Sequence, residues 1–427
     1  MLFNFFHFAF HKTKALIKMI KNIFQKMSLF VVLFAFISTH TTAQVNVCSV
    51  DGTNQVTGQP CVNTIVTSVP FLRIIPDARS GAMGDVGIAI SPDANAMHFN
   101  ASKLAFAEQD LGLSATYTPW LRALGLQDVY MAYLSGYRKI DDLQTVGLGL
   151  RYFSLGTIQF TDENGQPLGS DRPNEFELSL AYSRKLSDKF SAGLAMKYIY
   201  SRLANGQTVE DETITPGNAV AGDLSFTYRT PIEISGRDSR LTIGTAISNI
   251  GTKISYTQSA NKDYIPTNLG IGAGLEYDID DFNSIHFAVD INRLLVPTPP
   301  GGDPFSPENN NSGDPNVPDY KEKSVIAAAL SSFGDAPGGF GEEMRENTYS
   351  IGVEYWYDKQ FAVRVGHFNE HKTKGNRKFF TVGLGLKYNI FGLNFSYLVP
   401  TTNQRNPLDN TLRFSLLFDF GAFEGER

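Results

Sequence analysis

Cysteine, tryptophan and long apolar runs are scarce in this sequence. Two of its 427 residues are Cys and two are Trp. Cys48 and Cys61 have no neighbouring His or third Cys with which to make a zinc site, so we predict that they form a disulfide closing a short loop. After residue 43 no stretch has the ~20 apolar residues that a transmembrane helix requires. An excess of positive charge is also missing, and the net charge of −6 argues against nucleic acid as a partner.

The motifs that build common catalytic centres are absent as well. No Gly-x-Ser-x-Gly motif stands at a strand-to-helix turn, and none of the 7 His pairs with a plausible Ser and Asp. His367 and His371 are four residues apart, but they fall at a strand end, where this spacing does not converge on a metal as it does on a helix. We predict no catalytic residue, no cofactor and no metal site. A lipid-modifying enzyme with a site assembled from distant strands stays as an alternative.

The first 43 residues have the organisation of a signal peptide. Five lysines form a basic region, and Leu29–Ile37 follows as an apolar run that is too short to span a bilayer. Small residues then precede the predicted cleavage after Ala43, and Met19 and Met27 are alternative start sites. The mature chain is therefore predicted to be exported.

What the chain has in abundance is alternation between apolar and polar residues. In Leu412–Phe420 every even position is apolar, and three of these five residues are aromatic. A period of two indicates a β-strand with one apolar face, and similar segments recur with no helices to cover them. The repetition therefore predicts an all-β protein, a barrel whose apolar outer face meets lipid.

Fourteen such segments follow residue 108, an even number, as in single-chain bacterial barrels. The connections between them alternate between short and long, which is typical of short periplasmic turns and long external loops. We predict a fourteen-stranded antiparallel barrel in a bacterial outer membrane, in contact with lipid and lipopolysaccharide, with both termini in the periplasm. The predicted strands are Leu111–Tyr117, Val129–Arg138, Thr145–Phe153, Glu175–Arg184, Phe190–Tyr200, Ala221–Thr230, Arg240–Asn249, Asn268–Tyr277, Ser284–Asn292, Tyr349–Tyr357, Phe361–Phe368, Phe379–Tyr388, Phe391–Tyr397 and Thr411–Phe420.

Glycine and charged residues share the second face of several predicted strands, for example Gly383, Gly385 and Lys387. We assign this face to the lumen, where glycine lets another segment approach the wall closely and where charges are expected to pair. Residues 70–107 are rich in small and turn residues, and we predict that they fill the lumen as a plug, with Asp93 capping a short helix. The predicted parts are a signal peptide at 1–43, a periplasmic segment at 44–69, the plug at 70–107 and the barrel at 108–427.

The plug segment carries the motif by which the chain resembles a known family. Ala78-Arg79-x-x-Ala82-Met83-Gly84 is followed by Asp93-Ala94-x-Ala96 and by Asn100-Ala101-x-x-Leu104. This pattern resembles the plug region of FadL-like outer-membrane barrels and, more narrowly, that of the PorV family of the Bacteroidetes type IX secretion system. The run Leu294-Leu295-Val296-Pro297-Thr298-Pro299-Pro300 after the ninth strand strengthens the resemblance. Many relatives have Asn-Pro where this chain has Asn100-Ala101.

The resemblance implies a function in protein secretion. It implies binding of cargo proteins, through a conserved C-terminal signal domain, as they leave a large translocon barrel whose lateral gate the protein also closes. It further implies delivery of the cargo to a surface attachment complex that contains a sortase-like enzyme. We therefore expect a non-enzymatic shuttle, with a FadL-like transporter of hydrophobic small molecules as the alternative.

The longest predicted external loop, Arg293–Thr348, is the predicted partner-binding region. It contains a Pro-rich run and then Glu322–Phe333, whose apolar spacing predicts a short helix that ends at Gly334. Long loops that contain structure of their own are usually functional. The predicted contact residues are Leu294, Val296, Pro297, Pro299, Pro300, Ile326, Leu330 and Phe333.

Overall fold

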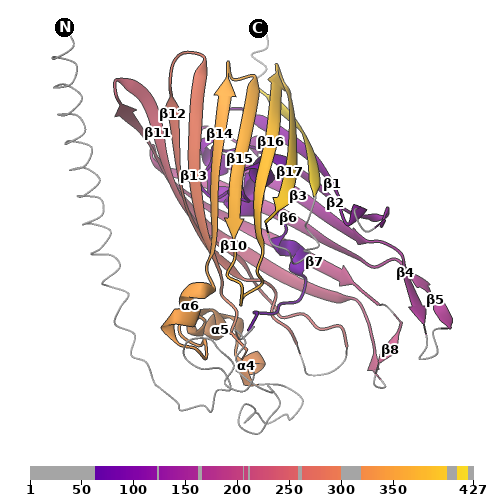
Figure 1. Ribbon diagram of the computed structural model, residues 1–427. Coiled ribbons are helices and arrows are strands. Elements are labelled where there is room, and N and C mark those ends of the chain that lie inside the picture. The colour runs from indigo at the N-terminus through magenta and orange to yellow at the C-terminus, as the bar shows by residue number, and fades with distance from the viewer. Residues whose placement is uncertain are drawn as a thin grey trace. The chain divides into compact units, whose positions relative to one another are not determined.

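The computed structural model describes residues 63–122, 125–161, 166–204, 206–209, 212–257, 262–299, 319–401 and 411–421. Within them fourteen strands form one closed antiparallel barrel, in which consecutive barrel strands pair and β1 closes against β18 (Figure 1). The predicted fold is confirmed. The predicted signal peptide, Cys48, Cys61 and Pro300 lie outside the described residues. The barrel strands are β1 (Leu111–Pro119), β2 (Val129–Lys139), β3 (Gln144–Leu155), β6 (Asn174–Ser187), β7 (Phe190–Arg202), β10 (Gly217–Ile234), β11 (Arg237–Gly251), β12 (Asn268–Asp278), β13 (Asn283–Leu294), β14 (Thr348–Tyr357), β15 (Phe361–Asn369), β16 (Lys378–Tyr388), β17 (Phe391–Pro400) and β18 (Leu412–Phe420).

The connections between barrel strands alternate in length, as the sequence predicts. At one end they are short, and Ser235 and Asn389 adopt φ angles of 55° and 54° there, as tight turns require. At the other end they are long, and two of them contain hairpins that the sequence analysis missed. These are β4 (Ile158–Thr161) with β5 (Pro167–Asp171), and β8 (Thr208–Val209) with β9 (Glu212–Thr213). We call the two ends the short-turn end and the long-loop end.

The outer face of the barrel is apolar. On β16, Leu384 and Leu386 are 48% and 53% exposed, whereas the neighbouring lumenal Thr381 is 1% exposed. Aromatic rings lie at both ends: the ring centroids of Tyr117 and Tyr130 are 5.6 Å apart toward the long-loop end, and those of Phe391 and Phe418 are 5.4 Å apart at the short-turn end. Such girdles are typical of barrels embedded in a membrane. None of the helices in the described ranges is long and apolar enough to cross a membrane.

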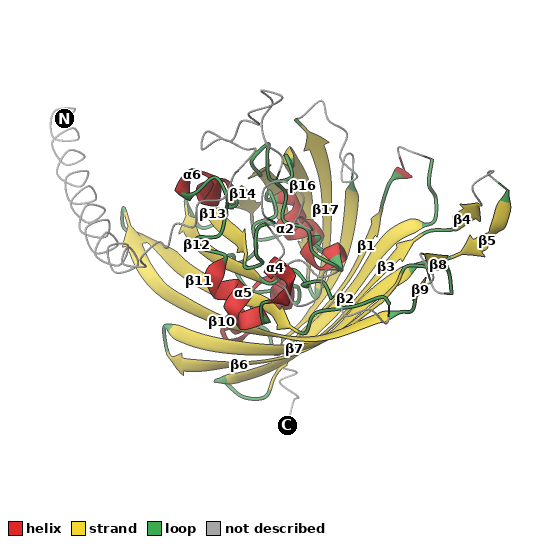
Figure 2. Cartoon of the chain, turned by 90° about the horizontal axis from the view of Figure 1, so that it is seen from below, coloured by secondary structure: helices red, strands yellow, loops and turns green. Residues whose placement is uncertain are grey.

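Residues 70–107 lie in the lumen as four short helices (Figure 2). Glycines of the wall allow this segment to approach closely. A Cβ atom at Gly366 of β15 would lie 2.0 Å from the backbone nitrogen of Gly84, and one at Gly352 of β14 would lie 2.5 Å from the carbonyl oxygen of Met83. The wall therefore admits no side chain at these positions while the plug is present. The plug helices are η1 (Pro70–Arg73), α2 (Ala78–Ala82), α3 (Ala96–Phe99) and η2 (Ala101–Phe106).

Side chains of the wall hydrogen-bond to the backbone of the plug. Asp290 of β13 accepts from the backbone nitrogens of Gly87 at 2.7 Å and Ile88 at 2.9 Å. Ser415 of β18 accepts from the backbone nitrogen of Ala78 at 2.8 Å. Because buried backbone groups must find partners, these contacts replace the hydrogen bonds that the plug, with its short helices, cannot make for itself.

The plug motif makes the ionic link between plug and wall. Arg79 donates to both carboxylate oxygens of Glu354 of β14, at 3.0 and 2.8 Å, and Glu354 also accepts from Arg364 of β15 at 2.6 Å. Arg79 donates to Asp93 as well, at 3.2 Å. These lumenal charges are thus paired with one another and with the plug, which offsets the cost of burying them.

The other motif residues pack or hydrogen-bond inside the barrel. Met83 is fully buried, and Asn100 donates through Nδ2 to Thr227 of β10 at 2.9 Å. The prediction for Asp93 is corrected, because Asn95 and not Asp93 occupies the position before α3. Asp93 instead accepts from the backbone nitrogen of Asn95 at 2.8 Å, in a turn that precedes the helix.

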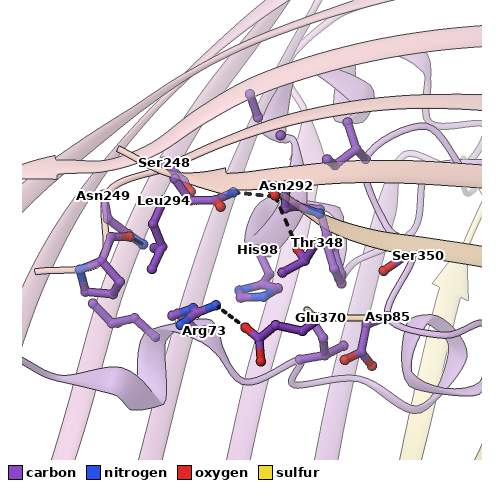
Figure 3. A pocket seen from close by; sticks show the side chains of 18 of the residues that line it. Arg73, Asp85, His98, Ser248, Asn249, Asn292, Leu294, Thr348, Ser350 and Glu370 are labelled. Atoms are coloured by element: carbon purple, nitrogen blue, oxygen red, sulfur yellow. Dashed lines mark hydrogen bonds and ion pairs between the residues drawn. The ribbon is translucent and has the colours of Figure 1, made fainter. Parts of the chain in front are cut away.

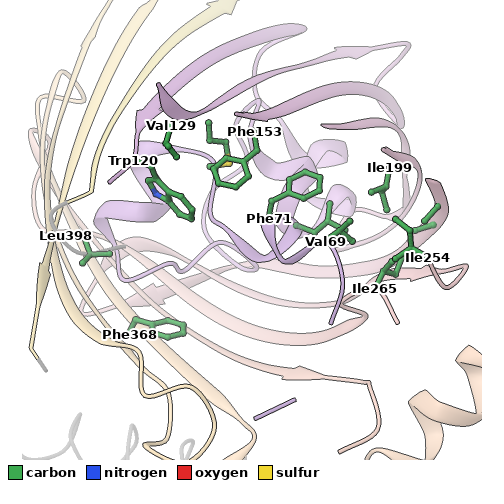
Figure 4. Packing of buried hydrophobic residues seen from close by; sticks show 14 of the residues in the cluster. Val69, Phe71, Trp120, Val129, Phe153, Ile199, Ile254, Ile265, Phe368 and Leu398 are labelled. Carbon is green, nitrogen blue, oxygen red and sulfur yellow. The ribbon is translucent and has the colours of Figure 1, made fainter. Parts of the chain in front are cut away.

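An apolar core fixes the start of the plug near the long-loop end (Figure 4). Val69 and Phe71 are 1% exposed and belong to one cluster with Phe153 of β3 and Ile199 of β7. The guanidinium group of Arg151 donates to the carbonyl oxygens of Phe71 and Leu72, both at 3.1 Å. Apolar packing and a buried charge therefore hold the same short helix.

Residues 63–69 lie at the long-loop end, on the same side of the barrel as the connections that are predicted to be external. The backbone nitrogen of Asn63 donates to the carbonyl oxygen of Thr373, between β15 and β16, at 3.2 Å. That of Ser68 donates to Tyr264, between β11 and β12, at 3.0 Å. The chain then runs through the lumen to begin β1 at the short-turn end, where β18 ends. Residues 63–69 therefore share a side with the long loops and cannot be periplasmic if those loops are external.

Candidate partner-docking site at the long-loop end

The connection between β13 and β14 contains three helices at the long-loop end (Figure 2). They are α4 (Asp319–Glu322), α5 (Val325–Ser331) and α6 (Phe340–Arg345). We call the described part of this connection, residues 295–299 and 319–347, the cap. The predicted helix within Glu322–Phe333 corresponds to α5, which Ser324 caps by accepting from the backbone nitrogen of Ala327 at 3.3 Å.

The first part of the predicted binding region is buried. Leu294 and Val296 are 7% and 2% exposed and pack in one cluster with Ala328 of α5. Pro297 is buried and Pro299 is half-buried. These residues join the cap to the barrel, and their contact with a partner stays a prediction.

The second part of the predicted binding region is exposed. Ile326, Leu330 and Phe333 are 69%, 73% and 51% exposed, and α6 adds Phe340 at 80% and Met344 at 47%. Phe340 and Met344 are not among the predicted contact residues, although they are four residues apart, as Ile326 and Leu330 are, and follow Gly338 and Gly339. We call these five side chains the apolar surface of the cap. Their binding to a partner stays a prediction.

Arg293, near the end of β13, holds both helices of the cap in place. It donates to the carbonyl oxygen of Ser332 after α5 at 2.5 Å and to that of Glu343 in α6 at 2.8 Å. Its guanidinium group also contacts the carboxylates of Glu343 and, at 3.0 Å, Glu346. With its side chain only 8% exposed, Arg293 is a buried charge whose partners all belong to the cap.

Negative charge exceeds positive charge in this anchor. Glu346 also pairs with Lys374 at 3.0 Å and accepts from Thr298 at 2.6 Å. Asp335, in the turn between α5 and α6, stands near Glu343. Burial, and then the charge of Glu343, raise the pKa of Asp335 to about 7, although the backbone of Thr298 acts in the opposite direction. Burial likewise raises the pKa of Glu343.

Residues 57–301, more than half of the chain, match the family described as Type IX secretion system protein PorV. The chain belongs to the PorV family. This membership makes it an outer-membrane component of type IX secretion. A search of curated proteins found no match.

Three solved structures illustrate what else the chain is similar to. The Ralstonia pickettii toluene transporter TbuX is 11% identical, with a TM-score of 0.45 over 81% of this chain and 98% of that one. The Pseudomonas putida toluene transporter TodX is 12% identical, with a TM-score of 0.45 over 81% and 98%. A Pseudomonas aeruginosa FadL homologue is 11% identical, with a TM-score of 0.40 over 84% and 100%.

The match to the PorV family covers some of the predicted site and not the rest. It includes the plug motif and the run from Leu294 to Pro300, and it ends before α5 and α6. The buried residues from Leu294 to Thr298 are therefore within the part of the chain that matches the PorV family. The five side chains of the apolar surface of the cap lie outside the matched residues.

Proposed function

We propose that this PorV-family chain binds secreted cargo at the apolar surface of the cap. The observation that carries the proposal is the exposure of five large apolar side chains, 47–80% each, on a structured loop. Lipid accounts for the exposed apolar residues of the strands, but these five lie beyond the strands, at the end of the barrel. An exposed apolar cluster on a fixed support is typical of a protein-interaction site.

The proposed ligand is the conserved C-terminal signal domain of the cargo. The large translocon barrel delivers it and the surface attachment complex with its sortase-like enzyme receives it, so the chain transfers cargo without catalysing a reaction. In this proposal the long-loop end faces the outside and the end of β18 faces the periplasm, in keeping with the usual distribution of loop lengths. An impermeant thiol reagent on intact cells should then label Leu330→Cys but not Phe282→Cys, and the reverse result would contradict the orientation.

A transporter of hydrophobic small molecules has less support from the lumen. Two cavities border the plug, and each has several charged residues in its lining, such as Arg73 and Glu370 in one and Arg240 and Glu276 in the other. A site for a hydrophobic ligand is normally lined by apolar and aromatic side chains.

Affinity isolation from gently solubilised outer membranes tests the proposal. The wild-type protein is compared with Phe340→Asp, with Leu330→Asp and with the control Phe282→Asp, which changes a residue 59% exposed at the short-turn end. We expect cargo and translocon barrel to co-purify with the wild type and the control, and to fall by about tenfold or more with each cap variant, since a charge at an apolar contact costs a few kcal/mol. Full retention of cargo by both cap variants would overturn the proposal. Bound fatty acid without a protein partner would favour the transporter.

A further inference from the structure

A small polar chamber lies between the plug and the long-loop end, inside the barrel and apart from the apolar surface of the cap (Figure 3). Its volume is about 120 Å³. Strands β11–β14 contribute neutral polar side chains such as Ser248, Asn292 and Ser350 to one wall. Arg73 of η1 and His98 of α3 lie opposite, together with residues of the connection between β15 and β16.

Positive charge is incompletely balanced beside this chamber. Glu370 accepts from Nε and Nη2 of Arg377 at 2.8 and 2.9 Å, which occupies both of its oxygens. Arg73 reaches the same carboxylate only at 3.6 Å, so one carboxylate serves two guanidinium groups. Burial, and then the charge of Arg377, lower the pKa of Arg73 to about 10. Asp85 also lines the chamber, and its carboxylate interacts with both Arg413 and Arg377, so it too is shared between two guanidinium groups.

The two lysines that line the chamber already have partners. Lys197 of β7 pairs with Asp223 at 2.7 Å and donates to Asn249 at 2.8 Å. Lys374 pairs with Glu346 at 3.0 Å and also contacts Glu342. The unsatisfied charge therefore belongs to Arg73 and Arg377, which come from different segments of the chain.

His98 adds a neutral donor to the same chamber. Its Nδ1 atom lies 2.5 Å from Nη2 of Arg151. Because an arginine can only donate, Nδ1 must accept, and the ring hydrogen is on Nε2. Burial, and then the charges of Arg151 and Lys197, lower the pKa of His98 well below its usual value, which keeps the ring neutral. His98 thus presents an N–H group to the chamber that Arg73 and Arg377 border.

We propose that this chamber binds a small oxyanion, a phosphate or carboxylate group, held by Arg73, Arg377 and the Nε2–H group of His98. The ligand supplies negative charge beyond that of Glu370 and Asp85, which are shared among Arg73, Arg377 and Arg413. Two arginines with a neutral N–H donor suit the oxygens of such a group. A volume of about 120 Å³ is that of a few water molecules, which fits one such group but not an acyl chain. Bound there, the anion bridges the plug, through Arg73, to the connection after β15, through Arg377.

Thermal unfolding of the purified full chain in an uncharged detergent tests this site. Inorganic phosphate at pH 7.5 is compared with sodium chloride at equal ionic strength, and acetate and a short-chain phosphatidic acid distinguish a free anion from a lipid headgroup. A ligand that binds the folded state at tenfold its Kd should raise Tm by about 2–4 °C. We expect this rise with phosphate and not with chloride. Equal shifts in the two salts, or no shift with any of the three anions, would overturn the proposal.

Variants separate the chamber from general salt effects. Arg73→Met should abolish the phosphate shift, while Arg237→Met, which removes an exposed ion pair with Asp281 at the short-turn end, should leave it unchanged. Should Arg73→Met fail to fold, Arg73→Lys retains the charge but not the forked geometry, and calorimetric titration should show at least a few-fold weaker phosphate binding. An undiminished affinity in the Arg73 variant that folds would contradict the assignment.

Discussion

The plug and the cap are both non-strand segments held by a buried arginine, but they place their apolar side chains on opposite sides. In the plug, Arg79 pairs with Glu354 of the wall and Met83 is fully buried. At the cap, Arg293 of β13 pairs with Glu343 of α6, while Phe340 of the same helix is 80% exposed. The plug therefore buries its apolar side chains against the barrel, whereas the cap, which Arg293 and a small apolar cluster hold in place, leaves five large apolar side chains exposed.

This difference separates a structural element from a candidate interaction site. The backbone of the plug touches wall glycines and donates hydrogen bonds to wall side chains, so the plug is complementary to the wall where the two meet. The cap leaves a cluster of apolar side chains uncovered, and burying them against another protein would be favourable by about 25 cal/mol per Å² of area removed from water. Changes in the plug should thus damage the fold, and changes on the cap should damage binding.

The largest effect is expected where the wall and the plug are closest. In Gly366→Ala the added Cβ would lie 2.0 Å from the backbone nitrogen of Gly84, so either the strand or the plug has to move. Overpacking typically costs about 1–3 kcal/mol and occasionally more, and we expect about 4 kcal/mol or more here because the atoms nearest the new Cβ are all backbone. Thermal unfolding in detergent should show the loss. The control is Gly222→Ala on β10, where the new atom would be 3.4 Å from the carbonyl oxygen of Ala195. Equal stability of the two variants would show that the plug is loosely held.

The features that sequence reasoning predicted are those that a local pattern encodes. The period of two in segments such as Phe379–Tyr388 identifies the strands and their outer face, since each residue's side depends only on its neighbours. Glycines such as Gly383 on the inner face indicated that something approaches the wall, and a Cβ there would lie 2.4 Å from that of Ala82. The even number of strands and the alternating connections then required a closed barrel.

The features that sequence reasoning missed depend on contacts between distant segments. Leu294 and Val296 are predicted as partner contacts, and nothing in their sequence shows that they are buried in one cluster with Ile65 of the N-terminal segment, Tyr264 and Ala328. No periodicity in the chain encodes this packing between distant segments. The ion pairs that hold the cap also join distant segments. Arg293 belongs to β13, Glu346 to the cap and Lys374 to the connection between β15 and β16. Only the exposed pair Phe340 and Met344 had a local signal.

Substitution of Arg293, which contacts both helices of the cap, should increase the local opening of the cap and leave the barrel unchanged. Arg293→Met leaves the carboxylate of Glu343 buried without its main partner, and breaking a buried ion pair costs about 3–5 kcal/mol. Lys374 still neutralises Glu346, so the loss should be at the lower end of that range. Hydrogen exchange should increase in residues 319–347 and stay slow in the strands of the barrel.

A matched change at an exposed position controls for the loss of positive charge. Lys323→Met removes an exposed lysine whose Nζ donates to Ser331 at 3.1 Å. Exposed polar contacts of this kind contribute well under about 1 kcal/mol. Faster hydrogen exchange of residues 319–347 in Lys323→Met than in Arg293→Met would contradict the conclusion that Arg293 holds the cap in place.

The smallest expected effect is the pH dependence of the cap. The pKa of Asp335 is about 7 in the folded protein against an ordinary value of 3.8, so the folded cap retains a proton that the opened cap releases. Stability that is fully present below pH 3.8 is therefore lost progressively as the pH rises through about 7. In Asp335→Asn this loss disappears, and at pH 8 the cap should be more stable than in the wild type by about 1–2 kcal/mol, a value reduced for solvent around a half-buried group.

Hydrogen exchange of residues 319–347 between pH 5 and 8, corrected for the intrinsic rate, measures this difference. The advantage of Asp335→Asn should grow up to about pH 7 and then stay constant, because above that pH Asp335 is charged in both states. Asp281→Asn is the control, since its side chain is 88% exposed at the short-turn end and should leave the profile of the cap unchanged. A difference that does not vary with pH would mean that the excess negative charge beneath the cap is neutralised in another way. The cap would then be held as firmly as the plug, and the apolar surface would be a rigid platform over the whole pH range.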